Sequence, residues 1–287
     1  MTIIITGATG ALNGATVDHL LERVPATQIV VAVRDLGKAQ RFVDLGIEVR
    51  HGDYSDPTSL PAAFAGADQL LLVSSSDPYA DAVALHRTAI DAAVTAGVGR
   101  ILYTSHQGAA ATTPFGPGRD HAATEQLLAE SGTPWTSLRN GFYAHSLNWS
   151  MGDWRETDVI TVPLDGPMSW TAREDSAEAA AAILASNGGY DGPVTLTAMS
   201  ALTFTDIATV ASEVSGRAVV TSILGEDAWL AAQLAAGHPE GMSRFMLGMY
   251  QAAHGGFFSG TDPLLAQILE REPQSVRDLL QQPAAAH

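Results

Sequence analysis

The feature that most constrains this chain is the alternation of short apolar runs with helix-like stretches through its first half. The runs are rich in β-branched residues, which is typical of strands buried on both faces of a sheet. Strands that alternate with helices pair in parallel, so the pattern predicts an α/β fold with a doubly wound parallel sheet. The expected strands are residues 3–6, 29–33, 48–50, 69–73, 100–104 and 135–138, and the expected helices are 14–23, 38–45, 59–64, 80–96 and 121–131.

The pattern changes after Asn140 to irregular sequence, an Ala-rich helix and, over 226–281, what we interpret as three helices. A chain of 287 residues is long enough for one α/β body and a smaller companion. We therefore expect a nucleotide-binding domain over 1–150, with a strand and helix near 190–216 that return to it. Residues 151–287 are expected to form a smaller, mostly helical satellite domain that covers the substrate.

A glycine-rich turn links the first expected strand to the first helix. Gly7 permits a tight turn, Gly10 lets the backbone approach a pyrophosphate, and the helix N-terminus offers unpaired N–H groups. This strand–turn–helix context favours a Rossmann-like dinucleotide site over a plain glycine turn. Asn13, followed by Gly14, stands where a third glycine is usual. The predicted contacts of the turn are Gly7, Thr9, Gly10, Ala11 and Leu12.

The second expected strand ends in Arg34, where an acidic residue would bind the ribose diol of NAD. A guanidinium suits the 2′-phosphate of NADP, and Lys38, the single lysine of the chain, follows on the same loop. Asp35 leaves NAD open as the alternative. We predict that the chain binds NADP(H) in preference to NAD(H).

Polar residues follow the third, fourth and fifth expected strands, at the edge where open α/β sheets bind ligands. Each of these side chains fits a helix cap equally well, and that alternative stays open. The predicted contacts are Asp53 and Tyr54 at the adenine, Ser74, Ser75 and Ser76 at the ribose, and Ser105 at the cofactor, on the wall of the site.

Together these motifs resemble the NmrA-like group of atypical short-chain dehydrogenases/reductases, and within it the type 2 NAD(P)H:quinone oxidoreductases. The resemblance rests on residues 6–10, 33–34, 38–39, 103–105, 124–125, 138–141 and 171–175, and it extends through nearly the whole chain. It implies an NAD(P)H-dependent oxidoreductase that reduces quinone-like aromatic acceptors by direct hydride transfer. The same group also contains aromatic polyketide tailoring enzymes, with monooxygenase-like or ketoreductase-like outcomes, and non-catalytic NADP(H)-sensing regulators that bind a protein partner, so both alternatives stay open.

The chain lacks the Tyr and Lys, four residues apart, with which conventional short-chain dehydrogenases exchange a proton. Its one lysine is Lys38, and no tyrosine lies between Tyr103 and Tyr143. Reduction of a quinone demands less, because the hydroquinone is a stable product and positioning supplies much of the catalysis. His106 and His121 are candidate proton donors near neutral pH, Asn140 a candidate to orient the nicotinamide amide or an acceptor oxygen, and Tyr143 a candidate stacking partner. Packing or turn roles for these four residues stay open.

The overall charge restricts the partners. Fifteen Lys and Arg residues against 31 Asp and Glu give a net charge of −16, which repels nucleic acid and anionic membranes. The chain has no cysteine and no paired His spacing of a metal site, so we expect no metal and a cytoplasmic location. The expected partner is a small aromatic or quinone substrate, and a homodimer is compatible with the sequence.

Overall fold

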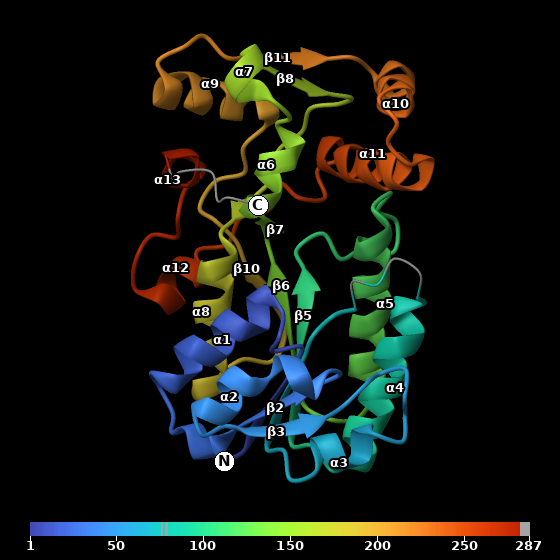
Figure 1. Ribbon diagram of the computed structural model, residues 1–287, viewed down its shortest axis with the longest axis vertical. Helices are drawn as coiled ribbons and strands as arrows, with labels where there is room; N and C mark the ends of the chain where they lie inside the picture. The colour runs from blue at the N-terminus through green and yellow to red at the C-terminus, as the bar shows by residue number, and fades with distance from the viewer. Residues whose placement is uncertain (76, 78–79, 282–287) are drawn as a thin grey trace. The chain divides into compact units, whose positions relative to one another are not determined.

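The computed structural model describes residues 1–75, 77 and 80–281, so Ser76 lies outside the described residues (Figure 1). Its largest element is a seven-stranded sheet with the order β10-β6-β5-β4-β1-β2-β3. The pairs of β1 with β2 and with β4 are parallel, and Ile3 lies opposite both Ile29 and Gln69. The strands are β1 (Ile3–Thr6), β2 (Ile29–Val33), β3 (Glu48–His51), β4 (Gln69–Leu72), β5 (Arg100–His106), β6 (Trp135–Asn140) and β10 (Gly192–Leu196).

The strand order reverses at β1, whose neighbours are β2 on one side and β4 on the other. In open α/β sheets, ligands bind beside such a reversal, at the carboxyl ends of the strands. All residues of β1, β2 and β4 are buried, which requires cover on both faces of the sheet. The predicted α/β, doubly wound, Rossmann-like fold is confirmed.

The helices that alternate with these strands differ from the predicted ones mainly at their ends. The first begins at Ala11 rather than at residue 14, because Gly10 is its N-cap. The fifth begins at Gly116, five residues before the predicted start, since a proline is tolerated in the first helical turn. The helices are α1 (Ala11–Leu21), α2 (Gln40–Asp44), α3 (Leu60–Phe64), α4 (Ala82–Thr95), α5 (Gly116–Glu130) and α8 (Arg173–Ala185).

The chain groups into two compact units, each built from several segments. Unit 1 contains residues 1–109, 120–139 and 174–194, and unit 2 contains 110–119, 140–173 and 195–287. The predicted division into 1–150 and 151–287 has a single boundary. The observed chain crosses from one unit to the other five times. That division stays a prediction about folding domains.

Unit 2 contains two short parallel ribbons and most of the remaining helices. The ribbons pair β7 (Phe142–Tyr143) with β9 (Trp170–Thr171), and β8 (Val159–Val162) with β11 (Val220–Ile223). The prediction of three helices over 226–281 is wrong, because the described chain has four there, with Pro263 and Pro273 before the last two. The helices are α6 (Leu147–Ser150), α7 (Trp154–Thr157), α9 (Phe204–Ser215), α10 (Glu226–Ala235), α11 (Glu240–His254), α12 (Leu264–Leu269) and α13 (Val276–Gln281).

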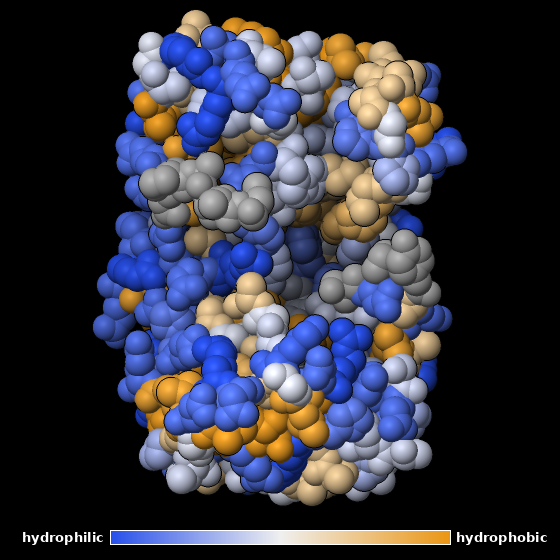
Figure 2. Space-filling model, in the orientation of Figure 1, coloured by the Kyte–Doolittle hydropathy of each residue, from blue (hydrophilic) through white to orange (hydrophobic). Residues whose placement is uncertain are grey.

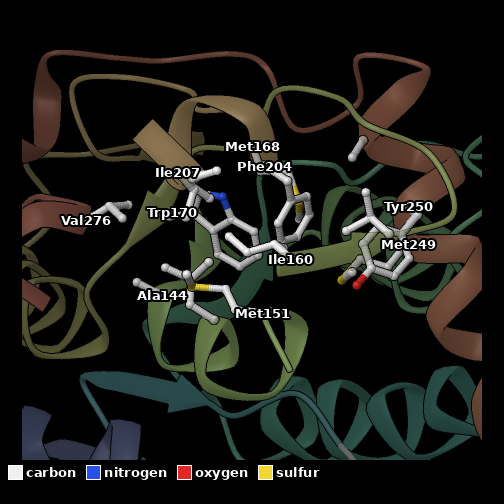
Figure 3. Packing of buried hydrophobic residues seen from close by; sticks show 14 of the residues in the cluster. Ala144, Met151, Ile160, Met168, Trp170, Phe204, Ile207, Met249, Tyr250 and Val276 are labelled. Atoms are coloured by element: carbon white, nitrogen blue, oxygen red, sulfur yellow. The ribbon is translucent and has the colours of Figure 1, made fainter. Parts of the chain in front are cut away.

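The core of unit 2 is built around Trp170, which is 1% exposed. Figure 3 shows its indole beside Phe204 and Ile160, with Tyr250 projecting from α11 into the same cluster. The rings of Trp170 and Phe204 meet edge to face with centroids 5.8 Å apart, an arrangement that aromatic pairs prefer. This packing fixes β9, and through it the neighbouring β7.

The surface is mixed in polarity. On the face in Figure 2, hydrophilic residues predominate and apolar residues gather in smaller patches. Across the described residues, no helix combines the length and the apolarity needed to span a bilayer. The same part of the chain contains no group of three or more His, Asp or Glu side chains arranged to hold a metal ion.

Candidate active site

The glycine turn has the geometry that a pyrophosphate requires. Gly7 has a φ of +62°, and the Gly10 N–H donates to the Gly7 carbonyl at 2.9 Å, closing the turn. A Cβ on Gly7 would lie 2.5 Å from a methyl carbon of Val73, so glycine is needed there for space as well. No side chain caps α1 at Gly10, and Thr9 and Ala11 are exposed. The N–H groups of the first turn of α1 are therefore left for an anionic ligand.

Asn13 does not disrupt this turn. Its side chain is buried, and its Nδ2 donates to the Thr6 carbonyl at the end of β1, at 2.8 Å. Gly14 provides the close approach, because a Cβ there would lie 3.0 Å from the Ala8 carbonyl oxygen. Asn13 Oδ1 has no hydrogen-bond partner in the described part of the chain. The side chain thus ties α1 to β1 at the position where the usual third glycine allows close packing.

The loop after β2 carries an arginine that forms no ion pair with the residues the structure describes. Arg34 is exposed, and none of the hydrogen bonds or salt bridges among the described residues involves it. Lys38 Nζ lies 3.9 Å from Asp35 Oδ2, while Asp35 Oδ1 accepts from the Gly37 N–H at 2.9 Å. Asp35 therefore caps the 3₁₀ turn η2 (Leu36–Lys38), and Arg34 remains free for a phosphate. These residues fit NADP(H).

Asp53 and Tyr54 are held firmly beside this loop. Tyr54 Oη lies 2.7 Å from Thr6 Oγ1 and donates to the Val73 carbonyl at 3.2 Å, so it joins the carboxyl ends of β1 and β4. Burial raises the pKa of Tyr54, which keeps the phenol protonated. Partial burial raises the pKa of Asp53, but hydrogen bonds from Ser55 and the charge of Arg34 outweigh it and lower that pKa below its usual value. Contact of either residue with adenine stays a prediction.

The serines after β4 are fixed by neighbouring side chains. The Ser74 N–H donates to Thr104 Oγ1 at 2.8 Å, and the Ser75 N–H donates to His86 Nε2 at 2.7 Å. His86 is 1% exposed on α4, and its Nδ1 lies 2.8 Å from Thr124 Oγ1. His86 is not among the predicted site residues, and only its place on the buried side of an amphipathic helix indicated it. Contact of Ser74 and Ser75 with the ribose stays a prediction.

Ser105 has a structural partner where a cofactor contact was expected. Its hydroxyl, which is buried, donates to Glu125 Oε1 at 2.8 Å. Glu125 also accepts from Ser137 Oγ at 2.7 Å and forms a two-point ion pair with Arg139. The hydroxyl of Ser105 therefore donates to α5, and contact of Ser105 with the cofactor stays a prediction.

His106 and His121 lie together, with rings stacked at 6.2 Å between centroids. Burial lowers the pKa of His106 to about 4, and burial together with His106 and His86 lowers that of His121. Both imidazoles are therefore neutral at pH 7, and a role of either residue as proton donor stays a prediction. Tyr103 Oη lies 2.8 Å from His121 Nδ1, and the tautomer of His121 decides which of the two atoms donates. His121 offers a neutral N–H.

Asn140 and Tyr143 form a pair in unit 2. Asn140 Nδ2 donates to Tyr143 Oη at 3.1 Å, which leaves the phenolic proton for another acceptor. Burial raises the pKa of Tyr143 to about 12, so the phenol is protonated at neutral pH. Asn140 is 2% exposed, and its Oδ1 has no hydrogen-bond partner among the residues described. The pair thus offers an unused donor and an unused acceptor, although the sequence analysis expected Tyr143 to act by stacking.

The corner between β6 and β7 places this pair. The Gly141 N–H donates to the Leu196 carbonyl at 2.8 Å. A Cβ on Gly141 would lie 2.1 Å from Thr171 Oγ1, so only glycine allows β7 to approach β9 this closely. The glycine therefore sets where Asn140 and Tyr143 stand.

Comparison with known proteins identifies the family. The family model described as the NmrA-like family matches residues 1–267. The chain belongs to the NmrA-like family. Quinone oxidoreductase 2 of Escherichia coli strain K12 is 39% identical over 267 residues, covering 91% of this chain and 92% of that protein. The predicted resemblance is confirmed.

Two solved structures of the family contain the cofactor. The NADPH-dependent quinone oxidoreductase QOR2 from Escherichia coli, complexed with NADPH, matches with a TM-score of 0.90 and 35% identity over 97% of this chain and 98% of that one. The triphenylmethane reductase of Citrobacter sp., complexed with NADP(H), matches with a TM-score of 0.86 and 33% identity over 98% and 99%.

Proposed function

We propose that this chain is an NADPH-dependent oxidoreductase that reduces quinone-like aromatic acceptors by direct hydride transfer. One observation carries the proposal, namely the open N-terminus of α1 at the glycine turn together with Arg34 after β2, which forms no ion pair within the described part of the chain. These features suit the pyrophosphate and the 2′-phosphate of NADPH. Similarity to the quinone oxidoreductase of Escherichia coli supports the class of acceptor.

The cofactor would be held by residues of unit 1. The turn formed by Gly7, Thr9, Gly10, Ala11 and Leu12 binds the pyrophosphate through its N–H groups, while Arg34 binds the 2′-phosphate. Lys38 contributes less than Arg34, because the carboxylate of Asp35 lies 3.9 Å from its ammonium group and offsets its charge. Asp53 and Tyr54 flank the adenosine, and Ser74 and Ser75 line the ribose side through their backbone.

The reaction requires a hydride and a proton, which together convert a quinone into a hydroquinone. Bound NADPH supplies the hydride. Tyr143 supplies the proton, because its hydroxyl accepts from Asn140 and its own O–H is unused. The Oδ1 atom of Asn140 accepts from an amide N–H of the ligand, and His121 and His106 act as neutral hydrogen-bond donors rather than as acids.

The binding partner, the cellular location and the assembly state are further parts of the proposal. The partner is a small aromatic molecule, and with a net charge of −16 the chain binds neither nucleic acid nor an anionic membrane surface. We place the protein in the cytoplasm and include a homodimer in the proposal. Size-exclusion chromatography with light scattering tests the assembly, and a monomer at micromolar concentration would remove the dimer.

The experiment that tests the function is steady-state oxidation of NADPH with a panel of benzo-, naphtho- and anthraquinones, in air and without oxygen. The proposal expects quinone-dependent turnover at equal rates in both. Turnover only in air would favour a monooxygenase-like tailoring enzyme. Tight NADPH binding without turnover under either condition would favour a sensor.

A further inference from the structure

Arg173 is a cation that forms no ion pair with the described residues, and it stands at a helix N-terminus, where a positive charge is disfavoured. It is the first residue of α8, where the partial positive charge of the helix N-terminus stabilises acids and opposes cations. Its side chain is partly buried, and no hydrogen bond or salt bridge among the described residues involves it. A partly buried charge without a partner costs folding free energy. Helix stability therefore does not explain Arg173.

The pairing of β7 with β9 places Arg173 beside Tyr143. The two strands run in parallel with Tyr143 opposite Thr171, and Arg173 follows two residues after Thr171. The ring of Tyr143 stacks on His145 with centroids 5.8 Å apart. Burial has the largest effect on both groups, since it raises the pKa of Tyr143 and lowers that of His145. The charge of Arg173 lowers the pKa of each. All of these residues belong to unit 2.

The donors of this cluster suit a negatively charged oxygen. Asn140 holds the Tyr143 hydroxyl from one side, so the phenolic proton is left to donate. Arg173 adds guanidinium N–H groups that match carboxylates and ionised hydroxyls. The protein as a whole carries a charge of −16 and repels anions at long range, so an anionic ligand needs a local cation.

We propose that Arg173 and the hydroxyl of Tyr143 form an anion-binding pair that holds an ionised oxygen of the aromatic acceptor. Acceptors that carry an ionised ring hydroxyl then bind more tightly than their neutral ethers. This specificity rests on the proposed function, because it assigns the ligand as the acceptor of that reaction.

The test is calorimetric binding of two naphthoquinones in the presence of oxidised NADP⁺, so that no turnover occurs. Lawsone has a ring hydroxyl that is ionised at neutral pH, and its methyl ether is neutral. The wild-type chain should bind lawsone about tenfold more tightly than the ether, the size of one charge-assisted hydrogen bond. In Arg173→Gln the two affinities should become equal through loss of lawsone binding, and Arg173→Lys should retain part of the preference.

The matched control is Arg244→Gln, which removes the same charge from the exposed surface of α11, where Arg244 pairs with Glu240. It should leave the preference for lawsone unchanged. Equal affinities in the wild type, an unchanged preference in Arg173→Gln, an equal loss in both glutamine variants, or no binding of either quinone would each overturn the proposal. Thermal unfolding of each variant shows whether it is folded.

Failure of this inference is distinguishable from failure of the proposed function. Quinone turnover with equal binding of lawsone and its ether removes only the role of Arg173. Absence of NADPH oxidation with every quinone, together with an Arg173-dependent preference for lawsone, removes the reductase and retains the anion-binding pair as a binding site.

Discussion

Burial shifts the pKa of two candidate proton donors in opposite directions, upward for Tyr143 and downward for His121. A pKa near 12 keeps the Tyr143 phenol protonated, and the Asn140 amide directs that proton away from itself. The pKa of His121 is lowered by burial and by two neighbouring histidines, so its imidazole is neutral. The residue types were visible in the sequence, but burial and tautomer depend on contacts between distant segments.

Replacing Tyr143 with Phe should lower kcat about a hundredfold, the lower range for loss of a positioned proton donor. The dissociation constant of NADPH should stay within about twofold of the wild type, because the phenol interacts with the acceptor in this account. Single-turnover kinetics and fluorescence titration measure the two quantities. An unchanged kcat would remove Tyr143 as the proton donor.

Replacing Arg34 with Ala should weaken NADPH by about 10- to 100-fold and NADH by much less, because only NADPH carries the 2′-phosphate. Equilibrium titration with both cofactors measures the effect. The matched control is Arg87→Ala, another exposed arginine of unit 1, which should change neither affinity. Equal losses for the two cofactors in Arg34→Ala would contradict the preference for NADP(H).

At the scale of elements, hydrophobic periodicity predicted the strands better than their ends. Strand β5 extends to His106 and β6 to Asn140, two residues beyond each prediction, and Ser105 and Asn140 near these ends are polar residues that the fold buries. The composition of residues 104–106 and 139–140 gave no sign of this burial. The turn at Gly7 was predictable because φ and space both require glycine, whereas the bond from Asn13 to Thr6 was not.

Replacing Asn13 with Ala should destabilise the fold by about 1–3 kcal/mol, because the Thr6 carbonyl loses its buried donor. Asn13→Gly restores the usual third glycine, but it removes the same buried donor and should cost a similar amount. Urea unfolding measures both values. Thr88→Ala on α4, which removes a solvent-exposed hydrogen bond to the Ala84 carbonyl, provides the control. Full stability of both Asn13 variants would show that the hydrogen bond contributes nothing.

At the scale of the whole molecule, two features arise from segments that are distant in sequence. The histidine cluster combines His86, His106 and His121 from three elements, and the two compact units interleave along the chain. Local patterns of hydrophobicity carry no record of either arrangement. The α/β class was nevertheless predictable, since it depends only on alternating strand and helix signals.

The buried histidines predict that stability falls in mild acid. The pKa of His86 and of His106 is about 4 in the folded chain because burial disfavours the charged form, against 6.5 for an exposed imidazole. Between pH 6.5 and 4 the unfolded chain binds more protons, so the free energy of unfolding decreases as the pH is lowered. Each histidine contributes a slope of up to about 1.4 kcal/mol per pH unit.

Urea unfolding from pH 7.5 to 4.5 measures this slope. His86→Asn should reduce it, and His238→Asn, a change at an exposed residue, should leave it unchanged. A wild-type stability that stays constant from pH 6.5 to 4.5 would contradict the neutral state of the cluster.

The most direct test of hydride transfer is anaerobic stopped-flow absorbance of NADPH bound to an excess of protein and mixed with a naphthoquinone. Direct hydride transfer predicts loss of the reduced-nicotinamide band in a single turnover, with slower loss when the transferred hydrogen of NADPH is deuterium. A band that persists in the presence of every quinone, although NADPH is bound, would contradict the account.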